Sequence, residues 1–153
     1  MRNYDEALPL ARRVLEARRR ALGNEHESTL LISINRVAQI LGRMGENEEA
    51  LQLHEGGLRL SRRKFGSEHP HTLVAIASLG ISCCELGRHG EGLPLLREAV
   101  AGRRKVQGEG DPDTQDAIQD LEQYEAEAAA AAAAEEEEEE TMYDRMRKRR
   151  RFR

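Results

Sequence analysis

The chain has 153 residues, of which 39% are hydrophobic and only 3% aromatic, and it contains no Trp. This composition predicts one domain with a modest core of aliphatic side chains. The net charge of −4 combines three unlike blocks: residues 1–108 carry +4, residues 109–144 carry 15 acids and no base, and residues 145–153 carry seven bases and no acid. No apolar run approaches the roughly 20 residues that cross a bilayer, and the first residues lack the apolar stretch of a signal peptide. We therefore expect a soluble protein that is not exported.

The predicted elements are helices throughout. Ala, Leu, Glu and Arg are abundant and only four Pro residues occur, so the intrinsic preference is helical. Apolar residues recur at helical spacing between breaks that contain Gly. We predict an all-α fold, with helices near residues 4–22, 29–44, 47–65, 71–86, 90–107 and from 113 onward.

The breaks between helices repeat along the chain. Residues 66–72 (Gly-Ser-Glu-His-Pro-His-Thr) align with residues 108–114 (Gly-Glu-Gly-Asp-Pro-Asp-Thr) at an offset of 42, and with residues 23–29 at an offset of 43. A Gly after an apolar-periodic run closes a helix with a positive φ, and a side-chain oxygen further on caps the next helix. We predict these caps at Ser28 or Thr29, at His71 or Thr72, and at Asp113 or Thr114.

Small residues fall where paired helices must touch. Ala38 and Gly80 occupy one helix of each pair, and Ala50 and Gly92 occupy the other. Without larger side chains there, the helix axes can approach to the short end of the usual 8–10 Å. Around them lie the predicted core residues Ile34, Val37, Leu41, Leu51, Leu58, Ile76, Leu79, Cys83, Leu93 and Leu96.

These motifs resemble tetratricopeptide repeats of the 42-residue kind found in kinesin light chains. The residues that carry the resemblance are Tyr4-Asp5-Glu6-Ala7-Leu8, Asn47-Glu48-Glu49-Ala50-Leu51, the links at 66–72 and 108–114, and the pair Leu79-Gly80. The resemblance covers residues 2–121 and implies a short α-solenoid of antiparallel helix pairs. Three departures stand out: Glu27 follows His26 where the family has Pro, one extra residue lies between Thr29 and Ala38, and Gly92 replaces the usual Ala.

Two regions are expected. Residues 1–122 form the solenoid, with about two and a half repeats that start in the middle of a repeat. Either upstream repeats have been lost, as in a fragment, or another chain covers the first helix. Residues 123–153 are an Ala/Glu-rich segment, predicted to be an extended helix or disordered, followed by the basic run.

The resemblance also implies where a partner binds. The first helices of the repeats line the inner side of the stack, and that groove suits a peptide or a partner helix. The extra residue leaves open whether Asn35 or Arg36 takes the family's recurrent Asn position. By position, the groove residues would be Asn35, Arg36, Gln39, Arg43, Ser78, Ser82 and Glu85. The alternative is an ordinary solvated helix face.

The basic run has three possible roles. Arg147, Lys148, Arg149, Arg150 and Arg151 resemble a nuclear-import signal, could neutralise nucleic-acid phosphates, or could fold back on Glu135–Glu140. The neighbouring acidic block repels polyanions, which argues against nucleic acid. We expect a cytoplasmic protein, with nuclear entry through this run as the alternative.

The sequence carries no pattern typical of catalysis. The histidines lack zinc-site spacing, and Gly108-Glu109-Gly110 lacks the lysine and preceding strand of a phosphate loop. Cys83 and Cys84 are adjacent and match no metal spacing, and no base near Cys84 is evident to activate it. We therefore predict no enzyme, no cofactor and no metal. The predicted function is an adaptor for a protein partner, with a motor complex as one candidate. The rivals are a nuclear or nucleic-acid-associated protein and a regulatory fragment of a larger multidomain protein.

Overall fold

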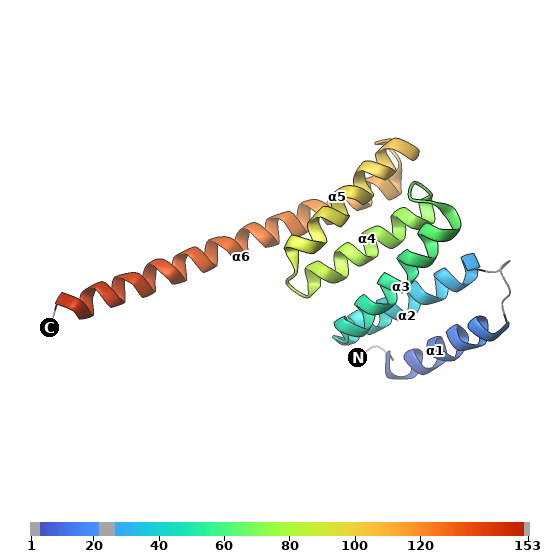
Figure 1. Ribbon diagram of the computed structural model, residues 1–153, viewed down its shortest axis with the longest axis horizontal. Helices are drawn as coiled ribbons and strands as arrows, with labels where there is room; N and C mark the ends of the chain where they lie inside the picture. Colours follow the sequence, from blue (N-terminus) through green and yellow to red (C-terminus); the bar gives the residue numbers. More distant parts are fainter. Residues whose placement is uncertain (1–3, 22–26, 152–153) are drawn as a thin grey trace.

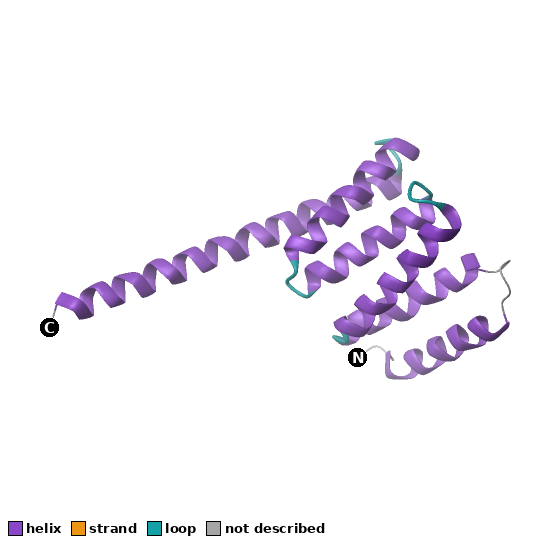
Figure 2. Ribbon diagram, viewed as in Figure 1, coloured by secondary structure: helices purple, strands orange, loops and turns teal. Residues whose placement is uncertain are grey.

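The computed structural model describes residues 4–21 and 27–151, with side chains described for residues 6–17, 20 and 29–147. Within these ranges the protein consists of helices joined by short turns (Figures 1 and 2). The helices are α1 (Tyr4–Ala21), α2 (Glu27–Met44), α3 (Asn47–Phe65), α4 (Pro70–Glu85), α5 (His89–Val106) and α6 (Pro112–Arg151). The all-α prediction is confirmed, and each helix begins within two residues of the predicted position.

The helices form an open stack of two layers. Each helix packs against the next one in the chain. The second, fourth and sixth helices also contact one another in sequence, α2 with α4 and α4 with α6, so these three form one layer (Figure 1). Among the described residues α1 and α6 share no contact, so the stack does not close into a bundle. This arrangement is the predicted α-solenoid.

The core falls into two clusters along the stack. The first joins α1, α2 and α3 and contains Leu15, Ile34, Val37, Ala38, Leu41 and Ala50. The second joins α3, α4 and α5, with α6 packed against it, and includes Leu51, Leu58, Leu73, Ile76, Leu79, Cys83, Cys84, Leu96 and Ala99. Of the ten predicted core residues only Leu93 is half-buried rather than buried.

Small residues mark the closest helix contacts, as predicted. A Cβ added to Gly80 would lie 3.0 Å from the carbonyl oxygen of Gly92, and one added to Gly92 would lie 2.6 Å from the carbonyl oxygen of Gly80. Ala38 and Ala50 are almost fully buried at the equivalent contact of α2 with α3. The absence of larger side chains therefore sets the spacing of each pair.

The links differ from prediction at their caps. Gly66 and Gly108 have the expected positive φ, 83° and 90°. The capping side chains, however, stand earlier than predicted: His69 Nδ1 accepts the His71 N–H at 3.1 Å, and Asp111 Oδ1 accepts the Asp113 N–H at 3.0 Å. Pro70 and Pro112 are the first residues of their helices, where a missing N–H costs nothing.

The predicted caps at His71 or Thr72, and at Asp113 or Thr114, are therefore wrong, since these residues lie inside α4 and α6. The cap at Ser28 or Thr29 is wrong for the same reason, because α2 already begins at Glu27.

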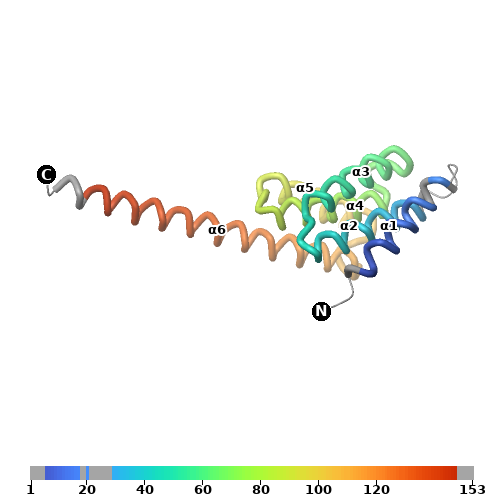
Figure 3. Tube along the Cα trace, turned by 90° about the horizontal axis from the view of Figure 1, so that it is seen from below, coloured from blue at the N-terminus to red at the C-terminus, as the bar shows by residue number. Residues whose placement is uncertain are grey.

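The last helix continues far beyond the stack. α6 contacts α4 and α5 near its start, and its residues from Ala129 to Arg147 are all exposed (Figures 1 and 3). The boundary expected at residues 122 and 123 falls inside this helix, because Tyr124 still packs on the core and Arg97 pairs with Glu125 at 2.7 Å. Of the two predicted states for the tail, the helix is the one observed.

Candidate protein-binding groove

A recess of about 180 Å³ opens between α2 and α4. The two helices form its walls because they are neighbours in one layer, and α3 lies behind both. We call this recess the α2–α4 groove. Its lining residues are Ala38, Gln39, Gly42 and Arg43 from α2, His54 from α3, and Ser78, Ile81, Ser82 and Glu85 from α4.

Five of the seven predicted groove residues line this recess. They are Gln39, Arg43, Ser78, Ser82 and Glu85. Arg36 lines a different hollow of about 280 Å³ between α1 and α2. Asn35 is half-buried and lines neither recess, but it stands four residues before Gln39, on the same helix face. Helical spacing thus places Asn35, and not Arg36, in line with the groove.

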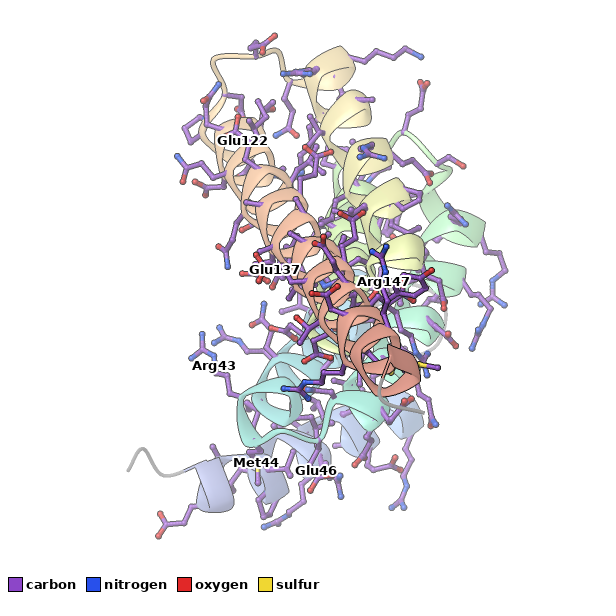
Figure 4. The ribbon with its side chains drawn as sticks, turned by 90° about the vertical axis from the view of Figure 1, so that its left-hand side faces the viewer. Arg43, Met44, Glu46, Glu122, Glu137 and Arg147 are labelled. Atoms are coloured by element: carbon purple, nitrogen blue, oxygen red, sulfur yellow. The ribbon has the colours of Figure 1, made fainter. Side chains whose placement is uncertain are left out.

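The rim of the groove carries both charges. Arg43 projects from α2 into solvent (Figure 4). Opposite it, the Glu85 side chain reaches across to α2, since its Oε2 would lie 3.7 Å from a Cβ on Gly42. Burial raises the pKa of the Glu85 carboxyl. The groove therefore presents a cation, an anion and neutral Gln and Ser side chains within one short stretch.

His54 forms the floor and was not among the predicted groove residues. It is only 4% exposed, and its Nδ1 has no hydrogen-bond partner. Burial lowers the pKa of His54 to about 4, so the imidazole is neutral at physiological pH. Its spacing from Leu51 and Leu58 could have indicated burial, since all three share one face of α3. Sequence alone gave no signal that this face borders a recess.

Acidic side chains gather around Tyr124 of α6, near Glu85 of the groove. Burial raises the pKa of Asp120, and the neighbouring charge of Asp116 adds to the effect. The charge of Arg103 partly offsets the effect at Asp120, because it lowers the pKa of that carboxyl. The pKa of Tyr124 is raised to about 12, mainly by burial and to a smaller extent by the negative charges of Glu85 and Glu127.

The remaining side chains that could react or bind a metal have structural roles. Cys83 and Cys84 are both buried. His69 stacks on Phe65 with ring centroids 4.5 Å apart while it caps α4. Across the part of the chain that the structure describes, no group of three or more potential ligands could hold a metal ion, and no helix is long and apolar enough to cross a membrane.

An open stack of antiparallel helix pairs with a polar groove on one layer defines a repeat scaffold of the kind that binds other proteins. Two sequence profiles, both described as tetratricopeptide repeat, match residues 29–105 and 1–28. The chain belongs to the tetratricopeptide repeat family, whose fold is a non-catalytic scaffold for protein interaction.

Solved structures share this fold. BtubC (BKLC) from P. vanneervenii matches with a TM-score of 0.70 and 18% identity over 80% of this chain and 48% of its own. A provisionally assigned kinesin light chain from Podosopora anserina, built of nearly identical TPR-like repeats, matches with a TM-score of 0.68 and 24% identity over 90% of this chain and 64% of its own. The chain thus spans between about half and two thirds of these proteins. No curated protein matches the sequence.

Proposed function

We propose that this protein is an adaptor whose α2–α4 groove binds a peptide segment or helix of a partner protein. The observation that carries the proposal is the convergence of Gln39, Ser78 and Ser82, from two successive helices of one layer, on a single recess. Amide and hydroxyl groups can both donate and accept, so they suit a peptide backbone.

The charges around the groove indicate the kind of segment that fits. Arg43 places a positive charge on the α2 wall, and Glu85 places a negative charge on the α4 wall. A segment with an acidic and a basic side chain, in that order from α2 to α4, would match both walls. The likeness in fold to a kinesin light chain-like protein supports a cargo protein of a motor complex as the partner.

The test is selection of peptides against the full chain from a displayed random library, followed by titration of the selected peptides. With Gln39→Ala, Ser78→Ala and Ser82→Ala combined, we expect the Kd to rise about tenfold or more, because buried hydrogen bonds of a bound segment are lost. A matched control combines Gln52→Ala, Glu91→Ala and Gln119→Ala, which are exposed and line no groove wall. Equal affinity for both variants would refute the assignment, provided that circular dichroism shows both to be folded.

We infer a binding rather than a catalytic role for this chain. Burial raises the pKa of Cys84 to about 11, so the thiol is not poised as a nucleophile. A hydrolytic activity that survives purification and is lost with Cys84→Ala would contradict this inference.

A second candidate role concerns location. The run from Arg147 to Arg151 ends α6, and Arg147 is exposed there (Figure 4). We propose a cytoplasmic protein that this run can direct to the nucleus. Tagged protein with Arg147, Lys148, Arg149, Arg150 and Arg151 changed to Ala should then lose any nuclear signal. An unchanged distribution would remove this role.

A further inference from the structure

The outer part of α6 is a helix without tertiary support. We call residues 129–151 the α6 extension; at 1.5 Å per residue it is about 34 Å long. Figures 1 and 3 show it projecting beyond the other helices. Its described side chains, to Arg147, are all exposed, and an ion pair between α6 and the stack joins Arg97 to Glu125, before the extension begins. An isolated helix of this length is marginal in water, so its stability depends on what else contacts it.

The two charge blocks of the extension cannot neutralise each other within one chain. Residues 139–144, which stand four positions after the six glutamates, include no base. The helix is continuous from Glu135 to Arg151, so the basic run does not turn back. The block centres are about 16 Å apart along the axis, beyond the range of an ion pair. The glutamate block thus has no base at the helical spacing that follows it, whereas Asp144 stands three and four positions before Arg147 and Lys148.

One face of the extension combines these charges with apolar side chains. Met142 and Met146, both 59% exposed, are four residues apart and so lie on the same face. At 100° per residue, a stripe about 120° wide also contains positions 135, 138, 139, 145 and 149. Glu135, Glu138, Glu139, Met142 and Arg145 also line an open hollow, together with Ala134, Glu137 and Thr141 from beside the stripe. From its N-terminal to its C-terminal end, the stripe therefore carries acidic residues first, then the methionines, and basic residues last.

A second copy in antiparallel orientation matches this stripe. If Met142 faces Met146 of the other copy, Glu139 falls opposite Arg149, and residues 137–140 fall opposite residues 148–151. The arrangement has a two-fold axis at Asp144, so each contact occurs twice. Asp144 itself is 200° around the helix from Met142 and points away from the contact. A parallel pair would instead place acid on acid and base on base.

We propose that the α6 extension is a self-association surface, on which two copies of this chain pair antiparallel about Asp144. In this one register the methionines face each other and Glu139 of each copy falls opposite position 149 of the other, and the same sequence supplies both sides. Exposed ion pairs contribute little each and are screened by salt, so the dimer is weak and sensitive to ionic strength.

The first experiment measures association of the full chain by sedimentation equilibrium. At low salt we expect a monomer–dimer equilibrium whose Kd rises about tenfold or more on going to high salt. Changing Glu137, Glu138, Glu139 and Glu140 to Arg should abolish the homodimer, and so should changing Lys148, Arg149, Arg150 and Arg151 to Glu. Mixing these two variants should restore dimers that contain one copy of each. A matched control reverses Glu46, Glu91, Asp116 and Glu122 and should still dimerise.

A monomer at every concentration in low salt would overturn the proposal, as would a dimer unaffected by either charge reversal. The rival surface is the apolar patch of Leu10, Val14 and Ile32 on α1 and α2. A dimer lost with Val14→Glu but retained in both charge variants would place the contact there instead. Circular dichroism confirms that each variant is folded.

The second experiment tests the register. Variants with one added cysteine, Met142→Cys and Met146→Cys, are oxidised separately and as a mixture. The proposed register predicts that the mixed disulfide forms faster than either homodimeric one, since position 142 faces position 146. The native Cys83 and Cys84 are buried and serve as the internal background. Faster linkage of position 142 to position 142 would indicate parallel helices and overturn the proposal.

Discussion

Gly92 of α5 approaches Cys84 of α4 so closely that a Cβ on Gly92 would stand 2.4 Å from the Cys84 Sγ. The Cys84 side chain thus occupies the space in which a methyl group at position 92 would lie. The tetratricopeptide repeat pattern has Ala at this position. The smaller Gly92 therefore compensates for the space that the Cys84 thiol takes up. The helix pair keeps its short spacing because the larger residue has moved to the other helix.

We expect Gly92→Ala to destabilise the protein by about 1–3 kcal/mol, even though Ala favours helix by about 1 kcal/mol over Gly. The added methyl group would overlap the Cys84 Sγ and the Gly80 carbonyl oxygen. Adding Cys84→Ala should recover only part of the loss, because the Gly80 oxygen remains in place. The free energy of unfolding of the single and the double variant is measured by urea denaturation. Gly90→Ala, at an open position of the same helix, is the control. A Gly92→Ala protein as stable as wild type would contradict the close contact.

The links contain a buried hydroxyl whose partners differ between repeats. Thr72 Oγ1 donates to the Gly66 carbonyl oxygen at 2.7 Å and lies 3.1 Å from Ser61 Oγ. Thr114, at the equivalent position 42 residues on, is equally buried, but its hydroxyl has no partner. We expect Thr72→Val to cost about 1–3 kcal/mol, since it leaves the buried Ser61 hydroxyl without its Thr72 partner and removes the hydrogen bond to the Gly66 carbonyl oxygen. Thr114→Val should be neutral or slightly stabilising.

Chemical denaturation of both Thr variants gives the comparison directly. The substitution and the burial are the same, so a difference between them isolates the hydrogen bonds. Equal losses would mean that shape at the link, and not hydrogen bonding, determines its stability.

The cysteines should react slowly in the folded protein. Burial raises the pKa of Cys83 and of Cys84, that of Cys84 to about 11. Because only the thiolate is nucleophilic, alkylation at neutral pH should be limited by opening of the α4–α5 contact. Reaction with a maleimide, followed by mass spectrometry, is expected to speed up at least tenfold in denaturant. Rapid labelling of the native protein would show that the thiols are accessible.

Most of the fold could be predicted from the sequence because the features that determine it lie close together along the chain. The positive φ at Gly66 and Gly108, and the small residues at 38, 80, 50 and 92, depend on spacing within one repeat. The caps were predicted wrongly, because both Asp and Thr in a link can cap a helix and burial decides between them. Thr72 is buried against Ser61, which leaves His69 to cap α4.

The groove was predictable only in part. Gln39, Arg43, Ser78, Ser82 and Glu85 follow from the position of each helix in the repeat. The role of His54 depends on how three helices meet, which no spacing within α3 reveals. Arg36 lies elsewhere because it stands on the face of α2 that borders the hollow beside α1.

His54 should make stability depend on pH. Its folded pKa of about 4 lies below the ordinary 6.5, so between these values the unfolded chain binds a proton that the folded chain does not. The free energy of unfolding therefore falls as the pH drops from 6.5 to 4, by roughly 3 kcal/mol at most, and this contribution is fully present above pH 6.5. His54→Leu should remove that part of the pH dependence, whereas His71→Gln, at an exposed position, should keep it. Urea unfolding at a series of pH values measures the slope. Parallel losses in wild type and His54→Leu would show that other groups cause the acid sensitivity.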